Sequence, residues 1–365
     1  MGAKRPNLIT WERSDPNKPP YMSFTETILQ WYAAHRRDLP WRNITDPYRI
    51  WISEIILQQT RVAQGYDYYL RFVEAFPDVD TLARADEDEV LRLWQGLGYY
   101  SRARNLHAAA RQICGLGHFP TDYAGVRALK GVGDYTAAAI CSFAYGLPCA
   151  VVDGNVYRVL SRYFGLSTPI DTSQGKKEFA ALAAELLPAR QSADYNQGLM
   201  DFGSLQCLPA APRCTDCPLS DSCQAWATKT VEQLPVKSHR PKTTERFLIY
   251  IGVQTPQGIW LHRRGPGDIW QGLYELPLIE SPHALTQQEV LRHEWVSRWL
   301  PPGGTWRMVT QRCKHLLTHR TLWADCYWLT YSHDVPVPPD YKVVPLADMS
   351  RYAMPRLLLR LMNHL

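Results

Sequence analysis

The alternation of apolar and polar positions divides the chain into two regions. From residue 24 to about residue 226, short amphipathic stretches follow one another between turn signals, and few runs favour strands. The stretches at 24–37, 48–61 and 87–94 each place their large apolar residues on one helical face. This region is therefore predicted to be all-α.

The pattern changes after the helical region. Residues 231–246 contain prolines and basic residues without apolar periodicity, which is typical of a linker. Beyond it, β-branched and aromatic residues gather at 247–253, 259–263 and 321–331, with one helical stretch at 287–300. We predict a flexible N-terminus (1–22), a helical domain (23–230), a linker (231–246) and an α+β domain (247–365).

The composition is that of a folded globular protein. Hydrophobic residues make up 45% and aromatic residues 12%, which is ample for packed cores. No run approaches the ~20 apolar residues that cross a bilayer, and the first residues lack the apolar segment of a signal peptide. We expect a cytoplasmic protein without a membrane partner. The net charge of +5 is compatible with a polyanionic partner but does not require one.

Four of the nine cysteines stand close together at the end of the helical region. Cys207, Cys214, Cys217 and Cys223 have the spacing C-x6-C-x2-C-x5-C. In a reducing compartment such a group is better interpreted as a metal site than as disulfides. Spacing alone leaves open a structural zinc ion or a [4Fe-4S] cluster, since both take four thiolates.

A glycine turn precedes the helical run at 137–143. Gly131 and Gly133 stand in the segment Leu-Lys-Gly-Val-Gly-Asp-Tyr, where a tight turn exposes backbone N–H groups at a helix start. Such donors favour an anion, for example a DNA phosphate. Nearby basic residues support phosphate contact: Arg102, Arg104, Arg111, Arg127 and Lys130. The alternative is an ordinary connection between two helices.

Three motifs in order carry a resemblance to a known family. The hairpin, the segment Val-Asp-Gly-Asn-Val around Asp153 and the cysteine loop at 207–223 together resemble the endonuclease III superfamily of helix-hairpin-helix DNA glycosylases. The resemblance spans residues 24–226 almost continuously. It implies that Asp153 is catalytic and that the metal centre is a [4Fe-4S] cluster.

Further segments resemble the MutY branch, the adenine DNA glycosylases of base excision repair. These are Leu-Pro-Trp-Arg at 39–42, Ser-Glu-Ile-Ile-Leu-Gln-Gln-Thr-Arg-Val at 53–62 and Gly-Leu-Gly-Tyr-Tyr at 96–100. The resemblance implies double-stranded DNA with adenine opposite 8-oxoguanine or guanine as the substrate. It implies that Glu54 protonates adenine and that Gln59, Thr60 and Tyr99 enter the double helix. The adenine pocket would comprise Arg37, Trp41, Arg42, Leu57 and Asp201.

Two carboxylates would meet the needs of the reaction. Adenine leaves readily only when protonated, and the sugar then resembles an oxocarbenium ion that needs a negative charge. Apolar neighbours of Glu54 would favour its protonated form. Asp153 would stay ionised and stabilise the cation or bond to it transiently, with Asn155 and Tyr135 orienting the pair. Without the resemblance, a solvated helix carboxylate and an N-cap would be the preferred interpretations of Glu54 and Asp153, and Trp41 and Tyr99 could be core aromatics.

Tyr135 bears on the reaction type. In bifunctional relatives a lysine at this position attacks the sugar as an amine, and a phenol cannot form that Schiff base. We therefore expect a monofunctional glycosylase. The alternatives are a bifunctional glycosylase/AP lyase for oxidised pyrimidines, a noncatalytic iron-sulfur DNA-binding protein and a Nudix-type hydrolase fused to a DNA-binding module.

The C-terminal region resembles the second MutY domain, itself similar to Nudix hydrolases, through Trp-Gln-Gly-Leu-Tyr-Glu-Leu-Pro at 270–277. Residues 285–303 lack the glutamate-rich helix that holds magnesium, so no nucleotide hydrolysis is expected. Leu317, Thr318 and His319 stand where the family usually has Phe-Ser-His, which implies recognition of 8-oxoguanine by this loop. Leu317 replaces an aromatic ring. The protein is expected to act as a monomer at DNA inside the cell, in the nucleoid if the cell is bacterial.

Overall fold

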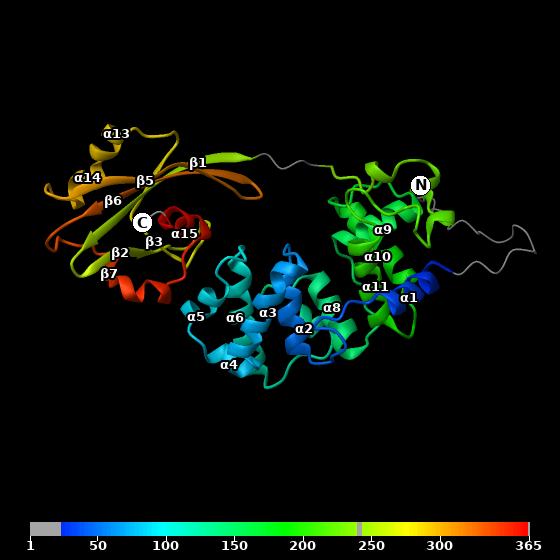
Figure 1. The fold of residues 1–365 in the computed structure, drawn as a ribbon. Coiled ribbons are helices and arrows are strands. Elements are labelled where there is room, and N and C mark those ends of the chain that lie inside the picture. Colours follow the sequence, from blue (N-terminus) through cyan, green and yellow to red (C-terminus); the bar gives the residue numbers. More distant parts are fainter. Residues whose placement is uncertain (1–22, 239–242, 364–365) are drawn as a thin grey trace, which may run out of the picture. The chain divides into compact units, whose positions relative to one another are not determined.

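The chain forms two compact units in this computed structural model, which describes residues 23–238 and 243–363. The first unit comprises the described residues up to Leu39 together with Gly146–Lys237, and the second comprises Pro40–Tyr145 together with the residues from Ser238 onward. The chain therefore leaves the first unit, returns to it and leaves it again (Figure 1). The predicted flexible N-terminus, residues 1–22, lies outside the described residues.

Helices α1 and α11 pack together in the core of the first unit. Ser23 caps α1, and Glu26 returns a bond to the Ser23 backbone, which completes a capping box. Phe24, Ile28 and Trp31 of α1 are buried against α9 to α11. The elements of this unit are α1 (Phe24–His35), α9 (Gly154–Phe164), α10 (Ser173–Leu186), α11 (Ser192–Leu205), η1 (Ser220–Ser222), α12 (Gln224–Ala227) and η2 (Val231–Gln233).

The N-terminal part of the second unit is also helical. Asp46 caps α2 by accepting bonds from the backbone of Tyr48 and Arg49, and Pro47 occupies the first helical position. The helices are α2 (Pro47–Leu57), α3 (Val62–Ala75), α4 (Val79–Arg84), α5 (Glu87–Leu93), α6 (Ser101–Leu116), α7 (Tyr123–Arg127) and α8 (Asp134–Tyr145). The prediction of an all-α region before residue 230 is confirmed. None of the described helices has the length and apolar content to cross a membrane.

A mixed sheet forms the C-terminal region, as predicted for an α+β domain. The strand order is β3-β2-β1-β6-β5, with β4 also paired to β1 and β7 to β2. The central strands β1 and β6 run parallel. The strands are β1 (Thr244–Thr255), β2 (Gly258–Arg263), β3 (Tyr274–Glu275), β4 (Leu278–Ser281), β5 (Thr305–Leu316), β6 (Arg320–Thr330) and β7 (Tyr341–Val344).

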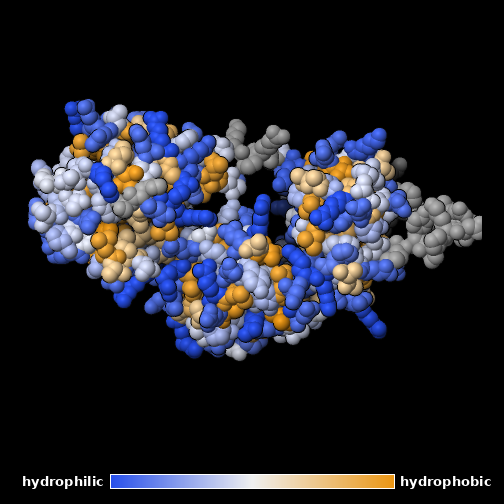
Figure 2. All heavy atoms as spheres, in the orientation of Figure 1, coloured by the Kyte–Doolittle hydropathy of each residue, from blue (hydrophilic) through white to orange (hydrophobic). Residues whose placement is uncertain are grey.

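Helices cover both faces of this sheet. Leu357, Leu358 and Leu361 of α15 (Arg356–Met362) join the core on one face. Val290 of α13 (Gln287–Leu291) and Val296 of α14 (Glu294–Trp299) join the core on the other. A 3-10 helix, η3 (Leu346–Arg351), precedes α15. The visible surface is mostly hydrophilic, with hydrophobic residues in small scattered patches (Figure 2).

Several predicted boundaries shift. Strand β1 begins at Thr244, inside the predicted linker. The predicted helix at 287–300 is two helices, because His293 caps a new helix start at α14. Strand β5 was not predicted, since most of its residues are at least partly exposed and many are polar.

Gly203 sets how closely α11 approaches the first turn of α9, where Asp153 lies. A Cβ atom on Gly203 would stand 2.7 Å from the Cβ of Asn155 and 3.1 Å from its carbonyl oxygen. We expect Gly203→Ala to lower the free energy of unfolding by about 1–3 kcal/mol, because the helices would have to move apart. Urea denaturation measures the change.

Gly115→Ala is the matched control for this substitution. Its Cβ would meet no atom within 4 Å, on helix α6. Alanine should therefore raise the free energy of unfolding by about 0.5–1 kcal/mol through its better helix propensity. Equal stability of the Gly203→Ala variant and the unchanged protein would contradict the tight packing of α11 on α9.

Candidate active site

Glu54 is a buried carboxylate on α2. Its exposure is 7%, and Ile52, Ile55 and Ile56 beside it are buried as well. The apolar surroundings expected for Glu54 are therefore present, and a solvated helix-face carboxylate is excluded. Such surroundings disfavour the charged form of a carboxyl group.

A phenol contacts this carboxylate. The hydroxyl of Tyr135, in the first turn of α8, donates a hydrogen bond of 2.6 Å to Oε2 of Glu54. A second contact joins the same two helices, from the amide of Gln58 to the hydroxyl of Thr136 at 3.1 Å. The structure thus brings together two of the four predicted catalytic residues, Glu54 and Tyr135.

The glycine turn before α8 has one constrained position. Gly131 has φ +77°, and a Cβ there would lie 2.5 Å from the Cβ of Asn105. This left-handed conformation and the close approach both require glycine. Gly133 has open space where a Cβ would stand, and its carbonyl accepts the first helical bond of α8 from Ala137.

The basic residues near this turn mostly bond to protein groups. Arg127 forms an ion pair of 2.6 Å with Asp134, and Arg111 donates to the carbonyl of Ala83. Arg104 donates to the carbonyl of Gln271. The expectation that the whole basic run faces phosphate is therefore corrected. Lys130 remains exposed at the turn.

Arg102, from the same run, caps the end of α2 instead. Its guanidinium donates to the carbonyls of Ile55 and Gln58 at 2.7 and 2.6 Å, and to that of Gly98 at 3.2 Å. Burial lowers the pKa of Arg102 to about 10. The side chain satisfies carbonyls at a helix C-terminus and ties α2 to the loop that carries Tyr99.

Asp153 caps α9 and is half-buried. Its Oδ1 accepts from the backbone N–H groups of Asn155 and Val156 at 2.8 and 2.7 Å, and its Oδ2 accepts from the Asn155 amide at 2.7 Å. The N-cap interpretation is therefore correct. Capping fixes the position of both carboxylate oxygens at the start of the helix.

Arg158 extends this network to the cysteine loop. Its guanidinium donates to Oδ1 of Asn155 at 2.8 Å, to the carbonyl of Gly203 at 2.6 Å and to that of Cys207 at 2.7 Å. Sequence reasoning missed this residue. A basic residue with buried neighbours on α9, where Val156, Val159 and Leu160 are all buried, was the available signal.

Opposing effects act on the pKa of Asp153. Burial raises the pKa of this carboxyl above its ordinary value, while hydrogen bonds from Val156 and Asn155 and the charge of Arg158 lower it. The net direction is upward, opposite to that expected of a permanently ionised group. The network of donors is what favours the carboxylate form.

The five residues predicted for the adenine pocket fall in both units. In the first unit, the guanidinium of Arg37 forms an ion pair with the fully buried Asp201 of α11. In the second unit, Trp41 and Arg42 are buried and Leu57 is half-buried. The Trp41 ring packs edge-on against Tyr69, with centroids 5.0 Å apart, as a core aromatic does.

The residues predicted to enter DNA are partly exposed. Gln59 and Tyr99 both have positive φ angles, 55° and 48°. Such angles are uncommon for residues other than glycine and occur often at functional sites. Tyr99 is 47% exposed, so it is not a core aromatic. Thr60 lies just beyond α2, which ends at Leu57, and its N–H donates to the carbonyl of Leu57.

The loop predicted to recognise 8-oxoguanine, Leu317 to His319, lies between β5 and β6. The hydroxyl of Thr318 is hydrogen-bonded to that of Tyr99. Leu317 packs against the core of the sheet, and His319 is exposed, with its carbonyl bonded to Thr244. Two of the residues predicted to contact 8-oxoguanine, Tyr99 and Thr318, therefore contact each other.

The four clustered cysteines line one cavity in the first unit: Cys207, Cys214, Cys217 and Cys223. Among the described residues, no three Cys, His, Asp or Glu side chains are arranged as a closed metal-binding group. Burial raises the pKa of the Cys217 thiol to about 11, and the charges of neighbouring cysteines act in the same direction. Arg162 also donates to Cys207 Sγ at 3.4 Å. Four thiols on one cavity are a donor set that suits a soft metal centre.

Two family models match the chain. The model of the HhH-GPD superfamily of base excision DNA repair proteins matches residues 52–188, and that of the NUDIX domain matches residues 249–364. These matches agree with a helical glycosylase-like region followed by a Nudix-like one.

Curated relatives and a solved structure extend this comparison. The chain is 35% identical over 316 residues to the adenine DNA glycosylase of Buchnera aphidicola subsp. Baizongia pistaciae, covering 84% of this chain and 86% of that protein. It is 39% identical over 223 residues to the adenine DNA glycosylase of Homo sapiens, covering 58% and 41%. The structure of a thermostable thymine-DNA glycosylase has a TM-score of 0.53 at 34% identity, covering 56% of this chain and 95% of that one.

Proposed function

Because the chain belongs to the adenine DNA glycosylase family, we propose that it excises adenine mispaired with 8-oxoguanine or guanine from double-stranded DNA. The reaction is hydrolysis of the N-glycosidic bond after the adenine nucleotide has been flipped out of the duplex. The observation that carries this proposal is the hydrogen bond from Tyr135 to the buried carboxyl of Glu54.

Glu54 acts as the general acid. Its apolar surroundings favour the protonated form, from which a proton passes to a ring nitrogen of adenine. The Tyr135 hydroxyl holds Oε2 of Glu54 in place and stabilises the carboxylate that remains after transfer. The protonated base then departs with the electron pair of the glycosidic bond.

Asp153 stabilises the sugar that is left behind. The oxocarbenium-like cation needs an anion near its ring, and the donors from Asn155 and Val156 favour ionised Asp153. Asn155 is itself oriented by Arg158. Addition of water to the cation releases the proton and leaves an abasic site.

The enzyme is monofunctional in this proposal. A lyase needs an amine that attacks the sugar. In this chain the position where bifunctional relatives carry that lysine is Tyr135, whose hydroxyl donates a hydrogen bond to Glu54. The strand therefore stays intact until the abasic site is cleaved by other means.

The base opposite adenine is recognised by residues of the α2–α8 region and of the C-terminal sheet region, both in the second unit. Gln59, Thr60 and Tyr99 enter the duplex beside 8-oxoguanine, and Thr318 and His319 read it from the C-terminal region. Leu317 packs on the sheet core and supplies the loop with an apolar anchor rather than a stacking ring. Because Tyr99 and Thr318 bond to each other, reading the base requires them to exchange that partner for DNA.

Five residues are proposed to contact adenine when DNA is bound: Arg37 and Asp201 of the first unit, and Trp41, Arg42 and Leu57 of the second. The Arg37–Asp201 ion pair presents a guanidinium held by a buried carboxylate. DNA phosphate binds at the turn of Gly131 and Gly133, where backbone N–H groups precede α8. We place the protein, acting as a monomer, at the DNA inside the cell.

The cysteine loop holds a [4Fe-4S] cluster when loaded. Cys207, Cys214, Cys217 and Cys223 are its ligands, and convergence of their thiolates on the cluster would order the loop after α11. When bound, the cluster would cross-link these four thiolates and so hold the loop in one conformation. Arg162 and Arg158, which bond to the loop, connect it to α9.

Alkali-dependent strand scission tests the proposal. The substrate is a duplex with one adenine opposite 8-oxoguanine, and the products are compared before and after hot alkali on a denaturing gel. Scission only after alkali is expected, because hydrolysis leaves an abasic site in an intact backbone. Equal scission without alkali would show lyase activity, and an intact strand under both conditions would support a noncatalytic DNA-binding protein.

Glu54→Gln tests the general acid. Glutamine keeps the shape and can accept the Tyr135 bond, but it has no carboxyl proton to give, so the single-turnover rate should fall about 10²–10⁴-fold. DNA affinity should stay the same. The matched control is Glu185→Gln, an exposed carboxylate on α10, which should cleave at the normal rate. Normal turnover by Glu54→Gln would refute the assigned role.

Cys217→Ser tests the cluster. Iron and sulfide analysis of protein purified without oxygen should show one [4Fe-4S] cluster per chain, and the variant should retain far less iron. Cys114→Ser, on α6 outside the loop, is the control and should keep the full iron content. Zinc in place of iron in the unchanged protein would overturn this assignment.

A further inference from the structure

Arg102 contacts two loops at once, and each loop carries a residue proposed to enter DNA. Its guanidinium donates to the carbonyl of Gln58 at 2.6 Å and to that of Gly98 at 3.2 Å. Gln59 directly follows the first carbonyl, and Tyr99 directly follows the second. One side chain therefore holds the peptide unit in front of each of these two residues.

Both residues have a backbone conformation that few side chains adopt. Gln59 has φ 55° and Tyr99 has φ 48°. A residue other than glycine is strained in this left-handed region and stays there only when its surroundings hold it. The hydrogen bonds of Arg102 provide such a restraint, because φ describes the rotation of a residue against the peptide unit before it.

Trp94 completes the arrangement on the Tyr99 side. Its ring is fully buried, and its indole N–H donates to the carbonyl of Gly98 at 3.1 Å. The guanidinium of Arg102 lies 5.2 Å from the centroid of this ring and 5.6 Å from that of the Tyr99 ring. The cation is thus placed against both aromatic side chains as well as against the two loops.

The position of Arg102 has a cost in stability. Its Nη1 also donates to the carbonyls of Ile55 and Ile56, at the end of α2, but its buried Nε–H has no acceptor among the described residues. An unsatisfied buried donor lowers stability. Such departures from ideal packing are expected at functional sites, where the position of a side chain matters more than its contribution to folding.

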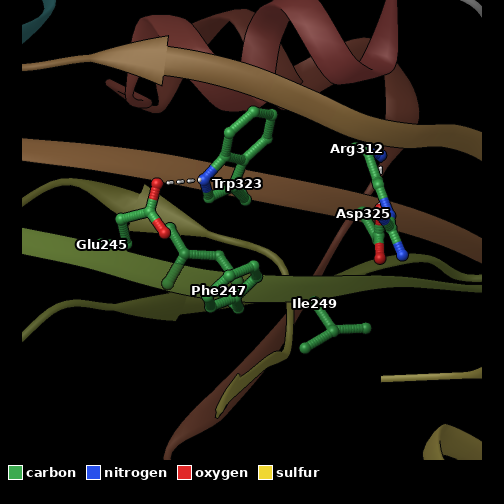
Figure 3. Close-up of a pocket in the computed structure, with 7 residues that line it drawn as sticks. Glu245, Phe247, Ile249, Arg312, Trp323 and Asp325 are labelled. Carbon is green, nitrogen blue, oxygen red and sulfur yellow. Dashed lines mark hydrogen bonds between the residues drawn. The ribbon is translucent and has the colours of Figure 1, made fainter. Parts of the chain in front are cut away.

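The hydroxyl of Tyr99 has a second partner, in the C-terminal region. It is hydrogen-bonded to Thr318, in the loop between β5 and β6. Further along these two strands, at the cavity shown in Figure 3, the backbone N–H of Arg312 donates to Oδ1 of Asp325 at 2.5 Å. The Tyr99–Thr318 bond has to break when both side chains turn to DNA. The bonds of Arg102 to backbone carbonyls can persist.

We propose that Arg102 is a specificity-determining positioning residue, which fixes the spacing of Gln59 and Tyr99 and thereby the preference for 8-oxoguanine over guanine opposite adenine. The inference rests on the proposed function. The two bases differ only at C8 and N7, so contacts that distinguish them require accurately placed groups. Without Arg102 the two loops move relative to each other, and the contacts that 8-oxoguanine alone offers are weakened. Excision opposite guanine, which lacks those contacts, is affected less.

Single-turnover rates with two duplexes test this inference, one with adenine opposite 8-oxoguanine and one with adenine opposite guanine. The readout is the ratio of the two rates, after active-site titration has given the active fraction of each preparation. In Arg102→Lys a single ammonium replaces the planar fork and cannot hold both loops in the same geometry, so the ratio should fall about tenfold. A purely structural role would lower the active fraction and leave the ratio unchanged.

Gly98→Ala gives a second test that leaves Arg102 in place. Gly98 has φ +77°, and a Cβ there would meet no atom within 4 Å, so alanine strains the backbone without a clash. Relaxation of this strain turns the peptide unit that Arg102 holds, and the ratio should fall in the same direction. This variant keeps the test decisive if Arg102→Lys fails to fold.

Arg92→Lys is the matched control. It makes the same chemical change at an exposed position of α5 and should keep the ratio of the unchanged protein. Equal rates of the unchanged protein on both duplexes, or an unchanged ratio in the folded Arg102→Lys variant, would overturn the role of Arg102 alone. If that variant does not fold, an unchanged ratio in Gly98→Ala decides in the same way. Absence of excision from both duplexes by the unchanged protein would instead overturn the proposed function.

Discussion

The first turn of α9 is where a carboxylate, a helix end and a distant loop are fixed by one hydrogen-bonded network. Asp153 accepts three hydrogen bonds, from Asn155 and Val156. The Asn155 side chain in turn accepts a hydrogen bond from Arg158, which also donates to the carbonyls of Gly203 and Cys207. A buried guanidinium is stable only when its donors are satisfied, so each member depends on the others. Burial raises the pKa of Asp153, and the same donors that cap the helix favour its charge.

A second guanidinium plays a comparable part in the other unit. Arg102 caps α2 and bonds to the loop before Tyr99, while the Tyr135 hydroxyl fixes Glu54 from α8. The general acid is therefore positioned by the end of its own helix and by a neighbouring helix. Both carboxylates of the proposed reaction are held by groups that themselves have several partners, which limits their motion in the absence of DNA.

Local pattern was enough to predict that the first 230 residues are all-α, to place the helices around residues 24–37, 48–61 and 87–94, and to predict the apolar surroundings of Glu54, because the periodicity of a helical face depends on neighbouring residues. The roles of Arg158 and Arg102 were not predictable, since their partners are carbonyls up to 49 and 47 positions away and carbonyls have no sequence signature. Strand β5 was not predicted, because polar and apolar residues alternate little along it. The spacing of the cysteines predicted a metal site, whereas the choice of a [4Fe-4S] cluster and the roles of Asp153 and Tyr135 came from the family resemblance.

The division of the chain also bears on the order in which it can fold. Helix α1 buries Phe24, Ile28 and Trp31 against helices that begin after residue 150, and Gly198 of α11 lies against Tyr32. During synthesis, α1 emerges from the ribosome long before those partners exist. Residues 40–145 can meanwhile assemble α2 to α8. The amphipathic first helix is thus a nascent segment with an uncovered apolar face, which is a natural ligand for a chaperone until α11 has been translated.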